Sequence, residues 1–121
     1  MQHFTKLRAW AHAHQWVLAI YRETRSFPVD ERYGVTAQLR RAASSVPANI
    51  AEGSKRRTDA DFARFVNIAE GSLSEAEYHL ILARDLGYLD PSELLEQVNE
   101  LGKMLNGLRE RLNSDAATSR R

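Results

Sequence analysis

Apolar residues recur every three or four positions through two long segments of this chain, and this spacing is what most constrains the fold. In a helix such spacing gathers the apolar side chains on one face, whereas a half-buried strand needs strict alternation. No segment alternates convincingly. The two stripes are Phe62, Val66, Ala69, Leu73, Ala76, Leu80 and Ala83, and then Leu94, Val98, Leu101, Leu105, Leu108 and Leu112.

Two earlier segments have the same period. The first stripe is Phe4, Leu7, Ala11, His14, Leu18 and Tyr21, widened by Trp10, Val17 and Ile20; the second is Val35, Leu39, Ala42, Val46 and Ile50. Pro28 ends the first helix, because the residue before a proline avoids helical geometry. The second helix is expected to begin near Asp30 or Glu31 and to stop at Gly53. Pro47 lies inside it and is expected to kink it rather than end it.

Start and stop signals also bound the third and fourth helices. Thr58 and Asp61 resemble a capping box, Gly87 closes the third helix, and Asp90-Pro91 opens the fourth. The connections are short, so neighbouring helices should be antiparallel. The sequence predicts an all-α, up-down-up-down four-helix bundle over residues 1–113, with a flexible polar tail over residues 114–121.

Composition narrows the class of protein. A chain of 121 residues fits one domain, and the absence of cysteine excludes disulfides and thiolate sites. No stretch approaches the roughly 20 apolar residues that cross a bilayer. The start of the chain does not resemble a signal peptide. We therefore expect a cytoplasmic protein that makes no membrane contact.

Charge is unevenly distributed along the chain, although the net charge is only +1. Residues 1–57 contain ten Lys and Arg against four Asp and Glu, whereas residues 58–100 contain two against ten. Acidic and basic helices that neutralise each other side by side would explain this pattern. A surface that binds a charged partner would explain it as well.

Several motifs, in this order and spacing, resemble the family of 23S rRNA intervening-sequence proteins. They are Phe4-Thr-Lys-Leu7 with Trp10, Tyr21, Phe27-Pro28, Glu31-Arg-Tyr-Gly34, Gln38-Leu-Arg-Arg-Ala-Ala-Ser-Ser-Val-Pro-Ala-Asn-Ile-Ala-Glu-Gly53, Ala69-Glu-Gly-Ser-Leu-Ser-Glu75 and Leu86-Gly-Tyr-Leu89. The resemblance implies a small four-helix bundle, related to the accessory bundle proteins of diversity-generating retroelements. It also implies pentameric rings, no catalytic activity, and nucleic-acid binding as the usual suggestion.

The candidate nucleic-acid residues are basic. Lys55, Arg56 and Arg57 are consecutive in the expected turn between the second and third helices, and Arg40 and Arg41 lie upstream. Basic clusters neutralise phosphates without reading sequence. A plain solvated turn is the alternative interpretation.

A structural network is the second candidate site. If the second and third helices are antiparallel, Glu70, Ser72 and Glu75 lie near Arg40 and Arg41, and a hydrogen-bonded network could hold the two helices together. The Asn49 amide could satisfy a carbonyl that Pro47 leaves without its donor.

The sequence gives little support for a catalytic site or a metal site. A site from Glu75, His79 and His14 can be drawn, but a partly buried, hydrogen-bonded histidine is the commoner outcome. No Glu-x-x-His pair, nucleophile elbow or phosphate-cradling glycine loop is present. We expect no enzyme activity, no metal and no cofactor.

Aromatic residues beyond the stripes suggest contact between copies. Trp16 is off the first stripe, and Trp10 adds further apolar area. We expect a homo-oligomer, with a pentamer favoured by the resemblance, that binds RNA or DNA. The alternative is a protein–protein adaptor for a neighbouring gene product, with no nucleic acid.

Overall fold

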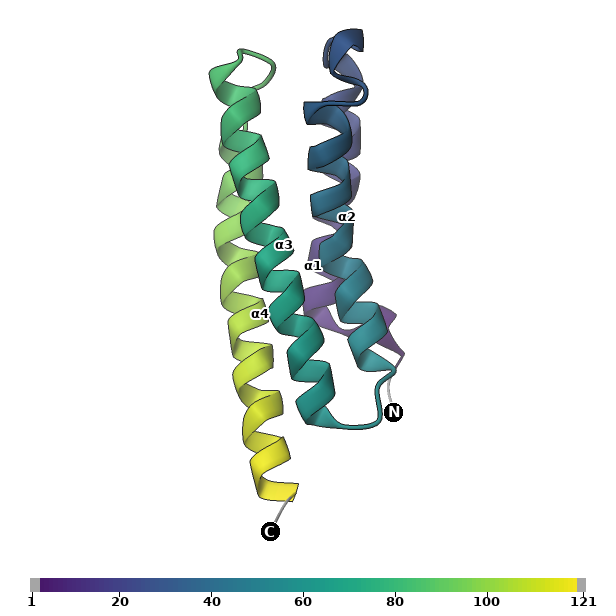
Figure 1. Ribbon diagram of the computed structural model, residues 1–121. Helices are drawn as coiled ribbons and strands as arrows, with labels where there is room; N and C mark the ends of the chain where they lie inside the picture. Colours follow the sequence, from purple (N-terminus) through teal and green to yellow (C-terminus); the bar gives the residue numbers. More distant parts are fainter. Residues whose placement is uncertain (1–2, 120–121) are drawn as a thin grey trace.

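The structure is a computed structural model, and it describes residues 3–119. Its four helices are α1 (Arg8–Glu23), α2 (Val35–Ser54), α3 (Asp59–Asp85) and α4 (Ser92–Ser119). A single 3₁₀ turn, η1 (Phe4–Lys6), precedes α1, and two more, η2 (Thr24–Ser26) and η3 (Val29–Glu31), lie between α1 and α2. The described residues contain no strand, and the fold is the four-helix bundle that the sequence predicts. In Figure 1 the chain rises along α1 and α3 and descends along α2 and α4.

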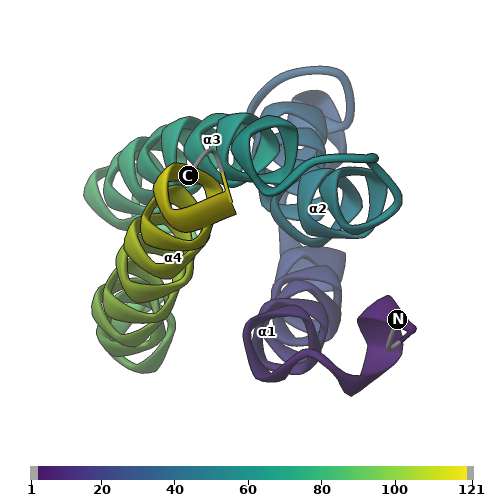
Figure 2. The same ribbon diagram turned by 90° about the horizontal axis from the view of Figure 1, so that it is seen from below.

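The four helices do not pack equally closely. Among neighbouring helices, contacts are most extensive between α2 and α3 and least extensive between α1 and α4. Seen from below, α2 and α3 lie side by side, while α1 and α4 stand apart (Figure 2). Three shallow hollows of about 320, 410 and 490 Å³ follow the seam between α1 and α4. This seam is the loosest part of the bundle.

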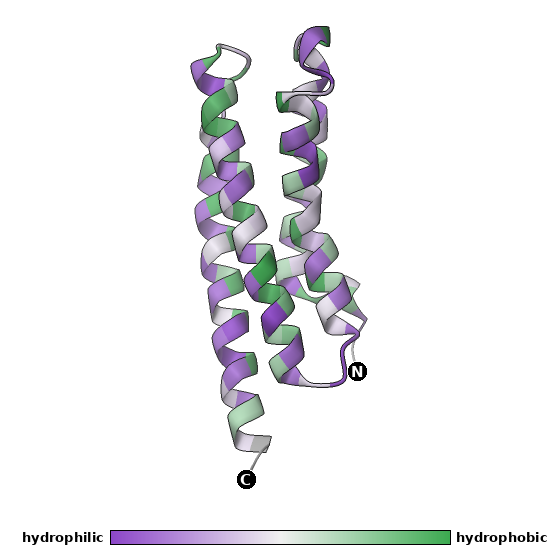
Figure 3. Ribbon diagram, viewed as in Figure 1, coloured by the Kyte–Doolittle hydropathy of each residue, from purple (hydrophilic) through white to green (hydrophobic). Residues whose placement is uncertain are grey.

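The stripes predicted for α2, α3 and α4 form the core. Every residue of these stripes is buried, except that Phe62 is half-buried against the core. Hydrophobic and hydrophilic residues accordingly alternate around each helix (Figure 3). The periodicity therefore identified both the helices and their inward faces in three of the four cases.

The face predicted for α1 is only partly right: Val17 and Ile20, which widen the predicted stripe, are buried, but the stripe itself is turned away from the buried face. The buried residues of this helix are Ala9, Ala13, Trp16, Val17 and Ile20, whereas Leu18 and Tyr21 of the predicted stripe are each 38% exposed. The helix has a polar side formed by Arg8, His12, Gln15, Arg22 and Glu23, but the apolar arc opposite it is wider than the face that packs, so more than one stripe fits the helical period. Packing against both α2 and α4 decides which face is buried, and two of the inward residues are small alanines that weigh little in a hydrophobic pattern.

Helix α2 continues unbroken through Pro47, as predicted, from Val35 to Ser54. The bend at Pro47 stays a prediction. The start is later than expected, because residues 29–31 form η3 instead. Glu31 still stabilises the N-terminal end of α2, since its carboxylate accepts a hydrogen bond from the Val35 amide at 3.3 Å.

Gly53 does not end α2, as the sequence suggested, but lies buried inside its last turn. A Cβ at this position would lie 2.7 Å from the Phe65 Cβ and 2.8 Å from the Phe62 Cδ1. Glycine is therefore needed here for the close approach of α3.

The signals at the ends of α3 mark both ends, as predicted. The Thr58 hydroxyl accepts from the Asp61 amide at 3.1 Å, which is one half of the predicted capping box, whereas the Asp61 carboxylate pairs with Arg64. Gly87 has φ +81°, and the next amide, of Tyr88, reaches back to the Ala83 carbonyl at 2.9 Å. This is the Schellman arrangement, in which glycine tolerates the left-handed conformation.

Helix α4 passes the predicted domain boundary. Asp90 precedes it and accepts from the Ser92 amide at 3.1 Å. The helix then runs beyond residue 113 to Ser119, so the segment predicted as a tail from residue 114 is helical as far as it is described. No glycine or proline follows Gly107, so nothing in the sequence stops the helix earlier. The flexibility of residues 114–121 stays a prediction.

Candidate nucleic-acid interface

The bundle has a basic half and an acidic half. Helices α1 and α2 together contain two acidic residues, Glu23 and Glu52, which lie in their last turns. Helix α3 contains six acidic residues and α4 contains five. The charge blocks of the sequence thus become two sides of one molecule.

Within residues 3–119, the ion pairs that join the two halves are limited to the contact of Arg56 with Asp61 at 3.8 Å. Three of the five ion pairs among these residues lie inside α3 and α4, and the other two involve Arg56 at the α2–α3 turn. Six arginines of the α1–α2 half form no ion pair with any described residue: Arg8, Arg22, Arg25, Arg32, Arg40 and Arg41. Five of them are exposed, and Arg40 is half-buried. Of the two interpretations of the charge pattern, mutual pairing is therefore the weaker.

Arg40 and Arg41 do not face the α3 carboxylates, as the sequence suggested. The Arg40 Nε donates to the Thr24 hydroxyl at 2.8 Å, and its Nη2 donates to the Tyr21 carbonyl at 3.2 Å. Its guanidinium also lies 4.6 Å from the centre of the Tyr21 ring. All these partners are neutral and lie at the C-terminal end of α1, where a cation is favoured. Arg41 is exposed and donates to the Gln38 side-chain oxygen of its own helix.

The three basic residues of the α2–α3 turn are exposed together, as predicted. Arg56 is held by Glu52 at 2.9 Å and lies 4.7 Å from the centre of the Phe65 ring. Its charge is therefore partly compensated. Lys55 and Arg57 form no ion pair with a described residue, so they are the members of this turn that can meet phosphates.

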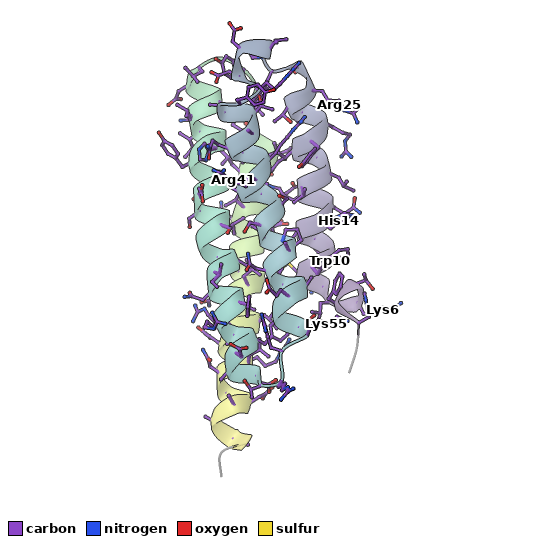
Figure 4. All side chains as sticks on the ribbon, turned by 45° about the vertical axis from the view of Figure 1, so that its right-hand side comes forward. Lys6, Trp10, His14, Arg25, Arg41 and Lys55 are labelled. Carbon is purple, nitrogen blue, oxygen red and sulfur yellow. The ribbon has the colours of Figure 1, made fainter. Side chains whose placement is uncertain are left out.

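The five predicted cations are not gathered in one place. Arg40 and Lys55 are fifteen residues apart on α2, which corresponds to about 22 Å along a helix axis. Figure 4 shows Arg41 well up α2, and Lys55 at the opposite end beside Lys6. The basic half is a long face with two centres of charge.

The predicted polar network is split in two. Its first part joins α2 to α3: the Ser45 and Ser72 hydroxyls are 2.9 Å apart, and the Asn49 amide donates to the Ser45 carbonyl at 2.8 Å. Proline at 47 removes the donor of the Ala43 carbonyl, four residues back. Asn49 therefore does not satisfy the carbonyl that we expected.

The second part lies between α3 and α4. Glu70 accepts from Arg109 at 2.5 Å, with the two side chains 23% and 30% exposed. This hydrogen bond raises the pKa of Arg109 above its ordinary value. Glu75 is exposed and joins neither part through its side chain. The sequence could not identify Arg109 as the partner, because that pairing depends on the relative rotation of α3 and α4.

Trp16 is not an interface residue in this structure. It is 1% exposed, and its indole donates to the Leu94 carbonyl at 3.3 Å, so it belongs to the seam between α1 and α4. Trp10 is half-buried, and its ring is stacked on that of His14 with centres 4.9 Å apart.

The residues of the candidate metal site are not gathered together. The distance from the His79 Nδ1 to the backbone carbonyl oxygen of Glu75 is 2.9 Å. Among residues 3–119 no three His, Asp or Glu side chains come together as metal ligands.

None of the helices in the described part of the chain is long and apolar enough to cross a membrane. The fold and the charge distribution together define a class: a small all-helical bundle in whose basic half most of the cations form no ion pair with a described residue. The chain belongs to the family of 23S rRNA-intervening sequence proteins, whose model matches residues 5–107.

One solved structure with a similar fold is that of a protein of unknown function from the S23 ribosomal protein family of Bacteroides thetaiotaomicron. The TM-score is 0.60 at 22% identity, and the alignment covers 89% of this chain and 97% of the other. At this identity the similarity shows the fold alone. The sequence matches no curated protein.

Proposed function

We propose that this protein is a non-enzymatic nucleic-acid-binding protein and that its α1–α2 half is the binding surface. One observation carries the proposal: six arginines of this half form no ion pair with any described residue. Phosphates would supply the missing counter-charge. Contacts of this kind give affinity without sequence readout and depend strongly on salt.

The test is a salt titration of binding to duplex DNA and to single-stranded RNA. Lys55→Ala/Arg57→Ala and Arg25→Ala/Arg41→Ala each remove two cations from the basic half, one pair near each of its ends. For every phosphate that a variant no longer neutralises, the log–log salt slope should fall by about 0.9 on duplex DNA and about 0.7 on single strands.

The matched control is Arg64→Ala/Arg84→Ala. It removes the same number of cations from α3, where both arginines lie within 3.0 Å of a neighbouring aspartate. Its salt slope should equal that of the parent. Equal slopes in all three variants would refute the assignment to the α1–α2 half. A parent that binds neither nucleic acid at low salt would leave the adaptor role in its place.

We also propose that the protein is a homo-oligomer, with a ring of five favoured by the family resemblance. Two features support self-association. The unlike halves are complementary, and a head-to-tail contact between two different surfaces forms a ring when the rotation from one copy to the next closes. Apolar side chains also face outward on opposite halves, with Leu18 of α1 38% exposed and Tyr78 of α3 58% exposed.

Light scattering at micromolar protein concentration tests this state at low and high salt. A ring assembled by unlike charges should lose mass at 1 M salt, where the screening length falls to about 3 Å. Tyr78→Glu should weaken assembly with helicity intact, and a monomer mass for the parent would end the proposal.

A location in the bacterial cytoplasm belongs to the same proposal and rests on the family, because 23S rRNA belongs to the bacterial ribosome.

A further inference from the structure

Four aromatic rings form a continuous row on the outer side of η1 and α1. The ring centres are 4.3 Å apart from His3 to Phe4, 5.2 Å from Phe4 to Trp10, and 4.9 Å from Trp10 to His14. His3 is exposed, and the other three are half-buried. The second tryptophan of the same helix, Trp16, is buried in the core. Trp10 and its neighbouring rings therefore remain partly exposed, whereas the core accommodates the tryptophan at position 16.

Several contacts hold the row in place. His3 caps η1, since its Nδ1 accepts from the Thr5 amide at 3.3 Å. The His14 ring is nearly parallel to the Trp10 ring, at 14°. Trp10 packs partly against the hydrophobic core, which anchors the row on α1. If the rings only packed η1 against α1, Phe4 and His3 would be buried. His3 is exposed and Phe4 is half-buried.

Lysines border the row. The Lys55 Nζ lies 5.7 Å from the centre of the Phe4 ring, and Figure 4 shows Lys6, Trp10 and Lys55 at one corner of the molecule. Neither lysine forms an ion pair with a described residue. Aromatic faces next to free cations are the combination by which proteins hold single-stranded nucleic acid, because unpaired bases stack on rings while phosphates meet the cations. Bases inside a duplex are already stacked on each other and cannot do this.

We propose that the ring row His3–Phe4–Trp10–His14 binds unpaired bases, with Lys6 and Lys55 on the adjoining phosphates, and so makes single strands the preferred ligand. This inference rests on the proposed function and adds the class of nucleic acid to it. The charge of the α1–α2 half attracts any polyanion, whereas the ring row distinguishes a single strand from a duplex.

The test compares a short poly-dT strand with a duplex of equal length, using the full chain over a series of salt concentrations that begins at low salt. Phe4→Ala removes a ring that lies outside the core, and Trp10→Leu keeps the apolar contact of a half-buried position. Each should weaken single-strand binding at least about fivefold. Duplex binding and the salt slope should not change, because stacking releases no counterions. Tyr33→Ala is the control, since Tyr33 is 86% exposed at the far end of the same half.

Tryptophan fluorescence gives an independent readout. Binding of poly-dT should quench the emission of the parent through Trp10, and the Trp10→Leu protein, which keeps only buried Trp16, should show no quenching. Circular dichroism of each variant checks that the bundle is folded.

The outcomes separate the two proposals. If the parent binds strand and duplex equally and Phe4→Ala changes nothing, the ring row is not a base-binding site, and the proposed function stands. If the parent binds neither ligand, both proposals fall. Quenching of Trp10 that grows with protein concentration in the absence of nucleic acid would assign the row to a contact between copies and overturn the inference.

Discussion

Replacement of Gly53 by alanine tests the close packing of α2 on α3. Glycine inside a helix costs about 0.8–1.0 kcal/mol relative to alanine, so propensity alone predicts a more stable protein. The structure predicts the reverse. The new methyl group would lie 2.7 Å from the Phe65 Cβ, against the roughly 3.5–4.0 Å of an ordinary carbon contact.

The magnitude follows from what can move. The Phe62 Cδ1, at 2.8 Å, belongs to a ring that can rotate, but the Phe65 Cβ is fixed to the backbone of α3. Relief therefore requires a shift of α3 itself. Overpacking of this kind costs about 1–3 kcal/mol, which offsets the propensity gain and leaves a net destabilisation of up to about 2 kcal/mol.

Gly107→Ala is the matched control, because a Cβ at Gly107 inside α4 meets nothing within 4 Å. This variant should gain the propensity term and become more stable by about 0.8–1.0 kcal/mol. The packing cost is then the difference between the two alanine variants, expected at about 1–3 kcal/mol.

Urea unfolding followed by circular dichroism measures the free energy of unfolding of all three proteins, at one protein concentration, because assembly would shift apparent stability. Thermal midpoints should differ by roughly 4 °C for each kcal/mol. If Gly53→Ala gains as much stability as Gly107→Ala, the close approach of α2 and α3 is wrong.

Two further outcomes follow from individual contacts. Trp16→Ala should lower the free energy of unfolding by about 3–5 kcal/mol, since the side chain is 1% exposed; a stable Trp16→Ala protein in which only assembly fails would instead restore the interface role. The Ser92 hydroxyl and then the Ser92 amide lower the pKa of Asp90 below 3.8, so this interaction stabilises the folded state above about that pH, and its contribution disappears as the pH falls through the lowered value. In Ser92→Ala the pKa of Asp90 should rise towards 3.8 in an NMR titration, and an unchanged value would show that the hydroxyl has no such effect.

The inward face of a helix could be predicted from the sequence wherever its apolar arc was no wider than the face that packs. In α2, α3 and α4 one stripe accounts for most of the buried face. Helix α1 also has a polar side, but its apolar arc is wider than the face that packs: Val17 and Leu18 both belong to this arc, and packing against α2 and α4 decides that Val17 is buried while Leu18 is 38% exposed. The same ambiguity made Trp16 look like a surface residue.

Local signals were reliable when their physical cause was local. The Thr58 cap and the left-handed Gly87 need only their own turn of chain. Gly53 was misinterpreted as a stop signal because glycine is needed there for a tertiary contact. A larger residue would clash with Phe62 and Phe65 of the next helix, and rules based on neighbouring residues in the sequence do not include such contacts.

The candidate site shows the same division. Which residues carry charge is evident from the sequence, but which charges remain uncompensated depends on how the helices are rotated. Arg40 binds neutral oxygens at the end of α1, and Arg56 is paired with Glu52. The cations able to meet phosphates are instead exposed ones such as Arg25 and Lys55, at the two ends of the α1–α2 half.

Charge separation of this kind needs a physical reason, because a bundle can pair α1 and α2 with α3 and α4 at little cost. Exposed ion pairs add at most about 1 kcal/mol each to the free energy of unfolding. Stability therefore has little influence on where surface charges lie. Net charge is close to zero, so solubility does not explain the separation either. We propose that the α1–α2 half is electropositive because it meets an anionic partner, which is either a nucleic acid or the acidic half of a second copy. Both contacts weaken as the salt concentration rises, so the salt titration with nucleic acid, compared with light scattering at the same salt concentrations, decides between them.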